Sequence, residues 1–218
     1  MYYLLIGLCL FFDIVYIICK AKKKNIVGLF AKVLAAFCFV TIGYKGYLVN
    51  KNAFTYCALM ALIVDAVGDL CLGLRNIFAK NLMFLIGTLS FLVGHATFIK
   101  GLMYLENPNI FNCIILGVVA GAILFYLLYR ICTMPKMMVP VGIIYTSLIC
   151  IFVCISLGVY INNQTIKNML FMIGAVLFVS SDILLILYNF SKKQWWLHPV
   201  YSLLYFLAQI FISYSLHL

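Results

Sequence analysis

Residues 1–24 read MYYLLIGLCLFFDIVYIICKAKKK, a largely apolar run followed by a cluster of lysines. A helix needs about 20 such residues to cross the hydrocarbon core of a bilayer. A cleavable signal peptide places its basic residues before the apolar run, whereas here they follow it. The segment therefore predicts a retained first membrane span whose C-terminal end lies in the cytoplasm.

The rest of the chain has the same composition. Hydrophobic residues make up 67% of the 218 residues and charged residues 9%. A soluble domain needs roughly a quarter of its residues charged to cover its surface. We therefore predict an integral membrane protein. The nine cysteines are scattered singly and include no C-x-x-C pair, so no disulfide framework, metal site or cofactor is expected.

Eight apolar runs are long enough to span a bilayer, and no segment between them is long enough for a soluble domain. Their length and the lack of two-residue alternation favour helices over barrel strands. The prediction is an all-α, polytopic bundle of eight transmembrane helices in a single domain, residues 1–218. The predicted spans are 1–19, 26–49, 53–73, 81–105, 110–131, 138–160, 167–188 and 197–217.

The net charge of +10 is explained by membrane topology. A nucleic-acid binder gathers its basic residues on one face, whereas these lie in alternate loops, so no nucleic-acid partner is expected. By the positive-inside rule, the richer loops face the cytoplasm and both termini lie on the other side. Ten basic residues fall on the predicted cytoplasmic side: Lys20, Lys22, Lys23, Lys24, Arg75, Lys80, Arg130, Lys136, Lys192 and Lys193. The other side has four: Lys45, Lys51, Lys100 and Lys167.

Charged residues also occur inside the predicted spans, where each costs about 2.5–3.5 kcal/mol and is therefore a candidate functional residue. With about 1.5 Å of rise per residue, Asp69 lies ~6 Å and Asp182 ~9 Å from the cytoplasmic ends of their spans. Lys32 lies ~9 Å into its own span from the same side. Three charges from three helices thus share one depth, which predicts a polar chamber open toward the cytoplasm.

Three further residues are expected to support this chamber. Asp65 lies one helical turn from Asp69 on the same face. Ser181 stands beside Asp182 in VSSDILL (residues 179–185). His198 begins the last span at the cytoplasmic side, where it either reaches the chamber or has an interfacial role.

The remaining buried polar residues favour structural roles. His95 is expected at a different depth from the chamber, in packing or in a hydrogen bond. Gln209 is expected to form a hydrogen bond between helices. For Asp13, a structural and a functional role stay equally open.

Several segments resemble the YhhN family of membrane proteins, the lysoplasmalogenases and their relatives. They are VDAVGDLCLG (64–73), FLIGTLSFLVGHATFIKG (84–101), MIGAVLFVSSDILLILYNF (172–190) and YFLAQIFI (205–212). The resemblance extends over roughly the second to the eighth span. The Asp positions of the third and seventh spans also align, DAVGDLCL over FVSSDILL, which leaves a parallel duplication of four helices open.

The resemblance implies hydrolysis of the vinyl ether bond of a lysoplasmalogen to a fatty aldehyde and a glycerophospho-base. The family's acidic residues fall on Asp69 and Asp182 and its lysine on Lys32. Vinyl ethers are cleaved by acid, through an oxocarbenium ion. A buried pair of carboxyl groups can hold the required proton, so we expect Asp69 and Asp182 to be catalytic, without assigning the acid. Lys32 would bind the lipid phosphate or offset the acidic charge.

The expected setting is the bacterial inner membrane, with the site facing the cytoplasmic leaflet and membrane lipids and a lysophospholipid as partners. A small-molecule or ion transporter would also place Asp and Lys at this depth, although the outer half has few polar residues. A non-catalytic lipid-binding relative stays open as well. A metal-dependent lipid amidase would need several histidines at one depth, which the three histidines do not supply.

Overall fold

The computed structural model describes residues 2–78, 81–105, 109–192 and 194–218. Within these ranges the chain forms eight α-helices, a short 3-10 turn (η1) and no strand. All eight helices are long and apolar enough to cross a membrane, which confirms the predicted all-α bundle. Lys80 and Lys193 lie outside the described residues. The elements are α1 (Tyr2–Ala21), α2 (Asn25–Val49), α3 (Ala53–Phe78), α4 (Asn81–Leu102), α5 (Ile110–Ile131), η1 (Lys136–Met138), α6 (Val139–Asn162), α7 (Ile166–Phe190) and α8 (Leu197–Ser215).

The largest differences from the predicted spans are in α3 and α4. Helix α3 continues to Phe78, although hydropathy predicts its end at residue 73. Helix α4 ends at Leu102 rather than at residue 105. Hydropathy reports the length of chain in hydrocarbon, whereas backbone hydrogen bonds can continue a helix beyond it. The extra turn of α3 carries Arg75, whose Nη1 donates to Asn189 Oδ1 of α7 at 2.7 Å.

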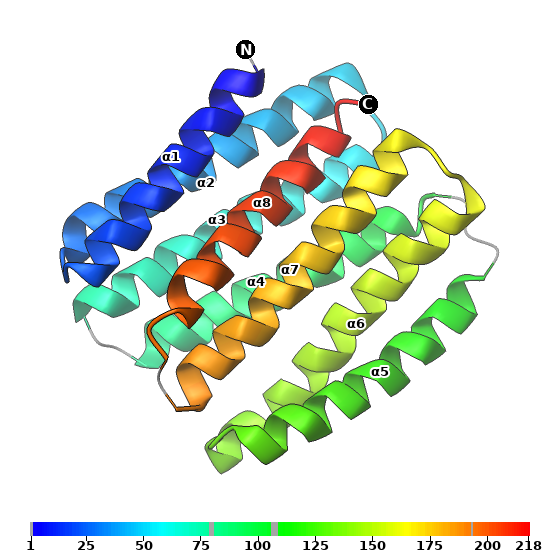
Figure 1. Ribbon diagram of the computed structural model, residues 1–218. Helices are drawn as coiled ribbons and strands as arrows, with labels where there is room; N and C mark the ends of the chain where they lie inside the picture. Colours follow the sequence, from blue (N-terminus) through cyan, green and yellow to red (C-terminus); the bar gives the residue numbers. More distant parts are fainter. Residues whose placement is uncertain (1, 79–80, 106–108, 193) are drawn as a thin grey trace.

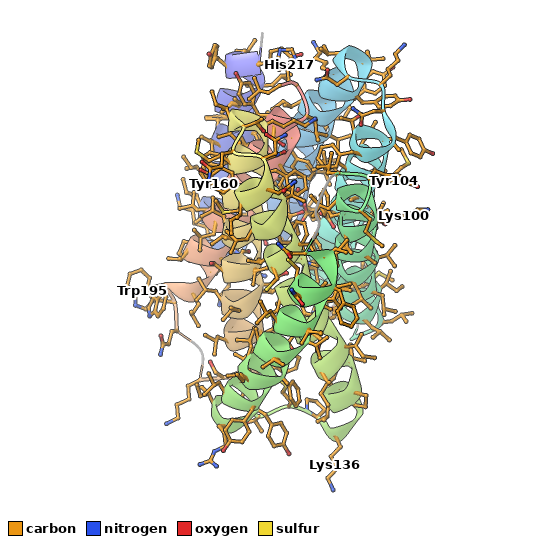
Figure 2. The ribbon with its side chains drawn as sticks, turned by 90° about the vertical axis from the view of Figure 1, so that its right-hand side faces the viewer. Lys100, Tyr104, Lys136, Tyr160, Trp195 and His217 are labelled. Atoms are coloured by element: carbon orange, nitrogen blue, oxygen red, sulfur yellow. The ribbon has the colours of Figure 1, made fainter. Side chains whose placement is uncertain are left out.

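Neighbouring helices in the chain pack in pairs, α1 with α2, α3 with α4, α5 with α6 and α7 with α8. The two termini lie at the same end of the bundle (Figure 1), and Lys136 lies at the end opposite His217 (Figure 2). Helix α8 contacts α1, α2, α3 and α7 and is therefore central. Helix α5 lies at one edge, against α6 (Figure 1).

Three glycines let α4 approach α3 closely. Gly87, Gly94 and Gly101 recur every seven residues, so they lie on one face of α4. A Cβ atom at each of them would meet a residue of α3: Leu72, Asp65 and Cys57 respectively. Small residues at helix contacts are the usual route to close packing in a membrane. The contact sets α4, with His95, against the acidic face of α3.

Candidate active site

A small buried cavity lies where α2, α3, α4, α7 and α8 meet, with a volume of about 20 Å³. It brings together four of the six residues expected in the chamber: Lys32, Asp69, Ser181 and Asp182. The other lining residues are Leu72, Phe91, Leu185, Tyr201, Ser202 and Tyr205. Two carboxyl groups, one from α3 and one from α7, thus line the same cavity as Lys32, which is the only basic residue in its lining.

Each carboxylate oxygen of Asp69 accepts a hydrogen bond. Lys32 Nζ lies 2.9 Å from Oδ1, and the Tyr205 hydroxyl donates to Oδ2 at 2.8 Å. Lys32 and Asp69 are 6% and 1% exposed, so the ion pair is shielded from water. Because both oxygens accept protons that belong to other groups, this geometry describes an ionised Asp69.

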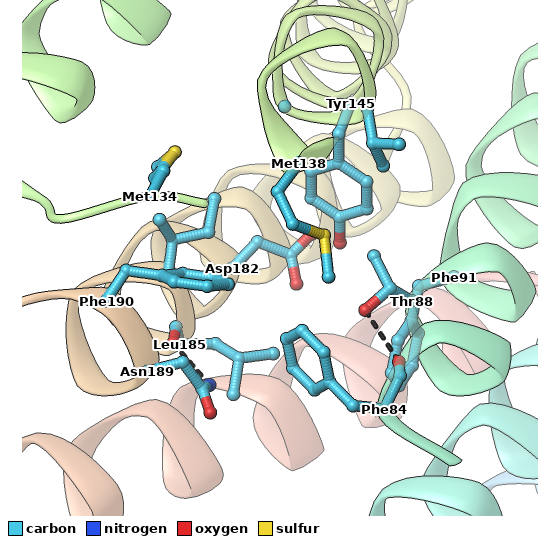
Figure 3. A pocket seen from close by; sticks show the side chains of 13 residues that line it. Phe84, Thr88, Phe91, Met134, Met138, Tyr145, Asp182, Leu185, Asn189 and Phe190 are labelled. Carbon is cyan, nitrogen blue, oxygen red and sulfur yellow. Dashed lines mark hydrogen bonds between the residues drawn. The ribbon is translucent and has the colours of Figure 1, made fainter. Parts of the chain in front are cut away.

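Asp182 has a different partner, His95 of α4. The His95 Nε2 atom lies 2.9 Å from Asp182 Oδ2, with exposures of 0% and 3%. The expectation that His95 lies at a depth apart from the chamber is therefore wrong. An N···O hydrogen bond needs a proton between its atoms, so this pair carries at least one. The Tyr145 hydroxyl points toward the same carboxyl group (Figure 3).

The misplacement of His95 has a geometric cause. A depth counted from the helix ends assumes that all helices are parallel and end at the same level in the membrane. In the structure α3 extends to Phe78, five residues beyond the predicted end of the third span, and α4 begins only at Asn81. Phe84, near the start of α4, lies beside Arg75 in the extra turn of α3, so residues counted from the start of α4 lie nearer that surface than the count suggests. His95 also packs edge-on against Phe178, with ring centroids 4.5 Å apart, one turn before Asp182 on α7.

A chain of hydrogen bonds connects the Lys32–Asp69 pair to Asp65. Gln209 Nε2 donates to the Tyr205 hydroxyl at 3.1 Å and to Asp65 Oδ2 at 2.8 Å. The expected helix-to-helix bond of Gln209 is therefore present, with Asp65 as its partner. Asp65 is fully buried but is not among the cavity-lining residues. It is connected to Asp69 through Gln209 and Tyr205 rather than by direct contact.

His198 and Asp13 lie beside the cavity rather than in it. His198 is 6% exposed, and its Nε2 lies 3.3 Å from the Tyr16 hydroxyl. Lys32 Nζ stands 5.5 Å from the centre of the same Tyr16 ring, so His198 reaches the ion pair through Tyr16. Asp13 is fully buried and accepts a hydrogen bond from Ser202 at 2.6 Å.

Ser181 lines the cavity, but its hydroxyl donates to the backbone carbonyl of Tyr201 at 2.9 Å. Its bond therefore joins α7 to α8. Sequence reasoning missed His95, Tyr205 and Gln209 as site residues. The signals were present, since Tyr205 and Gln209 are four residues apart on one face of α8 and His95 follows a glycine of the seven-residue repeat on α4.

An apolar groove of about 60 Å³ adjoins the cavity between α4, α6 and α7 (Figure 3). It shares Phe91, Asp182 and Leu185 with the cavity, so the Asp182 carboxyl group faces both spaces. Phe84, Met134 and Met138 contribute to its wall (Figure 3). Most of its lining is apolar, and the Asp182 carboxyl group is its only acidic group.

The fold and the cavity define a polytopic helical membrane protein with a buried site lined by two carboxyl groups and a lysine. Among the described residues, no group of three or more His, Cys, Asp or Glu side chains is arranged to hold a metal ion. The chain belongs to the YhhN family, whose sequence model matches residues 3–216. No curated protein and no solved structure matches it significantly.

Proposed function

We propose that this protein is a membrane-embedded hydrolase that cleaves the vinyl ether bond of lysoplasmalogens, giving a fatty aldehyde and a glycerophospho-base. The observation that carries the proposal is the single cavity lined by both Asp69 and Asp182, one held by Lys32 and the other by His95. Membership of the YhhN family supports the same class of reaction.

The reaction needs one proton donor and one anion. The donor places a proton on the β-carbon of the vinyl ether, whose π electrons form the new C–H bond and leave an oxocarbenium ion. Water then adds to the α-carbon and returns a proton to the donor. The resulting hemiacetal loses its hydroxyl proton and its C–O bond breaks toward glycerol, whose oxygen takes up a proton. The balance is substrate plus water to aldehyde plus glycerophospho-base.

The two carboxyl groups divide these roles. We assign the donor to the Asp182–His95 pair, which in its acid form carries one proton more than its hydrogen bond requires, and whose carboxyl group lines both the cavity and the apolar groove. Asp69, ionised beside Lys32, is the anion that stabilises the oxocarbenium ion. Glycosidases stabilise a similar oxocarbenium ion with two carboxyl groups. The analogy concerns the chemistry alone. Lys32 keeps Asp69 ionised and in position.

The distribution of basic residues among the loops supports the proposed orientation in the membrane. The end of the bundle with Lys136 (Figure 2) carries the connections that are rich in lysine and arginine, so we assign it to the cytoplasm. A lysolipid of the cytoplasmic leaflet would then have its head group near these loops and its chain between α4, α6 and α7. The bacterial inner membrane is the proposed location.

The test is aldehyde release from a lysoplasmalogen by the purified protein in non-ionic detergent. The wild type is expected to release aldehyde, and in D₂O the aldehyde, trapped at once by reduction, carries one deuterium at carbon 2. Asp69→Asn and Asp182→Asn keep the side-chain shape but lose the carboxyl group. Since general acid catalysis contributes about 10²–10⁴-fold, Asp182→Asn should lose at least a hundredfold in kcat.

Asp13→Asn is the matched control, because Asp13 is an equally buried carboxyl group whose hydrogen bond from Ser202 an amide oxygen can also accept. It should retain activity. A saturated ether lysolipid of the same chain length should not be cleaved. A wild type that releases no aldehyde from any vinyl ether lysolipid refutes the proposal and favours transport or lipid binding.

A further inference from the structure

The cavity between the two aspartates has the size and the polarity of a site for one water molecule. Its volume is about 20 Å³, and a polar cavity of roughly 10–15 Å³ or more can hold one water. Most of the side chains that line it are polar or charged. The adjoining groove is larger, at about 60 Å³, and mostly apolar. The two spaces therefore suit the two reactants of a lipid hydrolysis, water in the cavity and the lipid in the groove.

Asp182 stands between these two spaces. Its carboxyl group lines both the cavity and the groove, and His95 Nε2 lies 2.9 Å from its Oδ2 atom. A positioned carboxyl group can give a proton in one step and take one in the next. The same group can therefore give a proton to a carbon atom on the groove side and then take one from a water on the cavity side.

Ser202 lines the cavity from α8, whereas Asp182 lines it from α7. The Ser202 hydroxyl donates its only proton to Asp13 Oδ1 at 2.6 Å, and both residues are buried. A hydroxyl group has one proton and two lone pairs, so toward the cavity Ser202 can only accept a hydrogen bond. A water that donates one hydrogen to Ser202 and the other to Asp182 keeps a lone pair free for attack on carbon.

We propose that the cavity binds the hydrolytic water and that Ser202, held by Asp13, is a positioning residue for it. The inference rests on the proposed function for the reaction that consumes the water. The water oxygen forms a bond to the α-carbon of the oxocarbenium ion, and the C=O π electrons return to the ether oxygen. One water proton passes to Asp182, and the other stays on the hemiacetal hydroxyl, which donates to Ser202. Asp13 acts only as an acceptor, so the amide oxygen of Asp13→Asn holds Ser202 equally well.

The kinetic test is the product ratio of Ser202→Ala in dilute methanol. Methanol can add to the oxocarbenium ion in place of water, with its proton passing to Asp182, and the product is then a methyl acetal instead of the aldehyde. Ser202→Ala removes one hydrogen bond to the water and the oxygen atom that helps to exclude a larger nucleophile. The ratio of acetal to aldehyde should therefore rise about tenfold, the effect of one hydrogen bond. A merely structural loss lowers both products together and leaves their ratio unchanged.

Ser213→Ala is the matched control. Ser213 is a fully buried serine on the same helix, its hydroxyl donates to the Ile210 carbonyl at 3.1 Å, and it does not line the cavity. Its product ratio should equal that of the wild type. A ratio that stays the same in Ser202→Ala, or that rises equally in Ser213→Ala, overturns the inference.

A high-resolution crystal structure of the wild type in a lipidic mesophase tests the water site without any activity. One ordered water is expected within about 3 Å of Ser202 Oγ and of an Asp182 carboxylate oxygen. Such a water in a protein that cleaves no vinyl ether lysolipid shows that the water site stands and that the hydrolase fails. A wild type with no water between these two side chains overturns the site, whatever the protein cleaves.

Discussion

His95 Nε2 lies 2.9 Å from Asp182 Oδ2, joining α4 to α7 where both side chains are buried. The contact places a hydrogen-bonded carboxyl–imidazole pair beside the apolar groove that Asp182 lines. It also gives different partners to two aspartates that look alike in the sequence. Asp69 accepts hydrogen bonds from Lys32 and Tyr205, whereas Asp182 is hydrogen-bonded to a histidine.

His95→Gln tests whether the histidine exchanges a proton with Asp182 or only keeps the Asp182 side chain in place. Glutamine places an amide nitrogen where Nε2 stands and can still donate to Asp182, but it cannot exchange a proton with it. We expect the thermal stability in detergent to be nearly retained and kcat for aldehyde release to fall about a hundredfold. Combining it with Asp182→Asn should add little further loss, because the two residues act as a unit. Fully additive losses would contradict a shared proton.

Lys32→Met should destabilise the protein more than it would at an exposed site. The substitution leaves Asp69 as an uncompensated buried charge, which typically costs about 3–5 kcal/mol. Adding Asp69→Asn removes that charge, so the double variant should regain much of the stability but no activity. Unfolding in detergent, followed for both single variants and the double variant, measures the coupling. A double variant no more stable than Lys32→Met would show that the ion pair does not matter for stability.

Gly94→Ala should disturb the site from outside the cavity. A Cβ at Gly94 would overlap Asp65 Oδ1, so either the carboxyl group or α4 must shift. Overpacking of this kind costs about 1–3 kcal/mol, and the shift should reach His95, the next residue, and lower activity. Gly7→Ala is the control, since nothing lies within 4 Å of a Cβ at Gly7. The melting temperature and the rate of aldehyde release are measured for both variants. If Gly94→Ala and Gly7→Ala behave alike, the close approach of α3 and α4 is contradicted.

Tyr205→Phe removes one hydroxyl that serves two bonds. Asp69 loses its donor at 2.8 Å and Gln209 loses an acceptor at 3.1 Å. Unsatisfied buried polar groups cost about 1–3 kcal/mol, so a lower melting temperature is expected. The rate should fall less than in Asp69→Asn, because Lys32 still holds the carboxylate. A loss of activity as large as that of Asp69→Asn would instead give the tyrosine a direct part in catalysis.

The eight membrane helices and the positions of the buried charges along them can be predicted from the amino-acid sequence alone. Each span is a local property, because about 20 successive apolar residues suffice to fill the hydrocarbon core. The gathering of Lys32, Asp69 and Asp182 was also predictable, since all three lie near the same ends of their helices. Those inferences need only chain order and the rise per residue.

Which of these side chains contact one another depends on how the helices pack. Whether Asp182 meets Lys32 or His95 depends on the rotation of each helix about its axis and on the level at which it begins. The hydropathy of a span predicts neither the rotation of the helix nor the level at which it begins, because lipid-facing and buried residues in a membrane are equally apolar. The close approach of α3 and α4 at Gly94, and the central place of α8 with Tyr205 and Gln209, set those rotations. Side-chain hydrogen bonds act over about 3 Å, so a site of this kind is settled by packing.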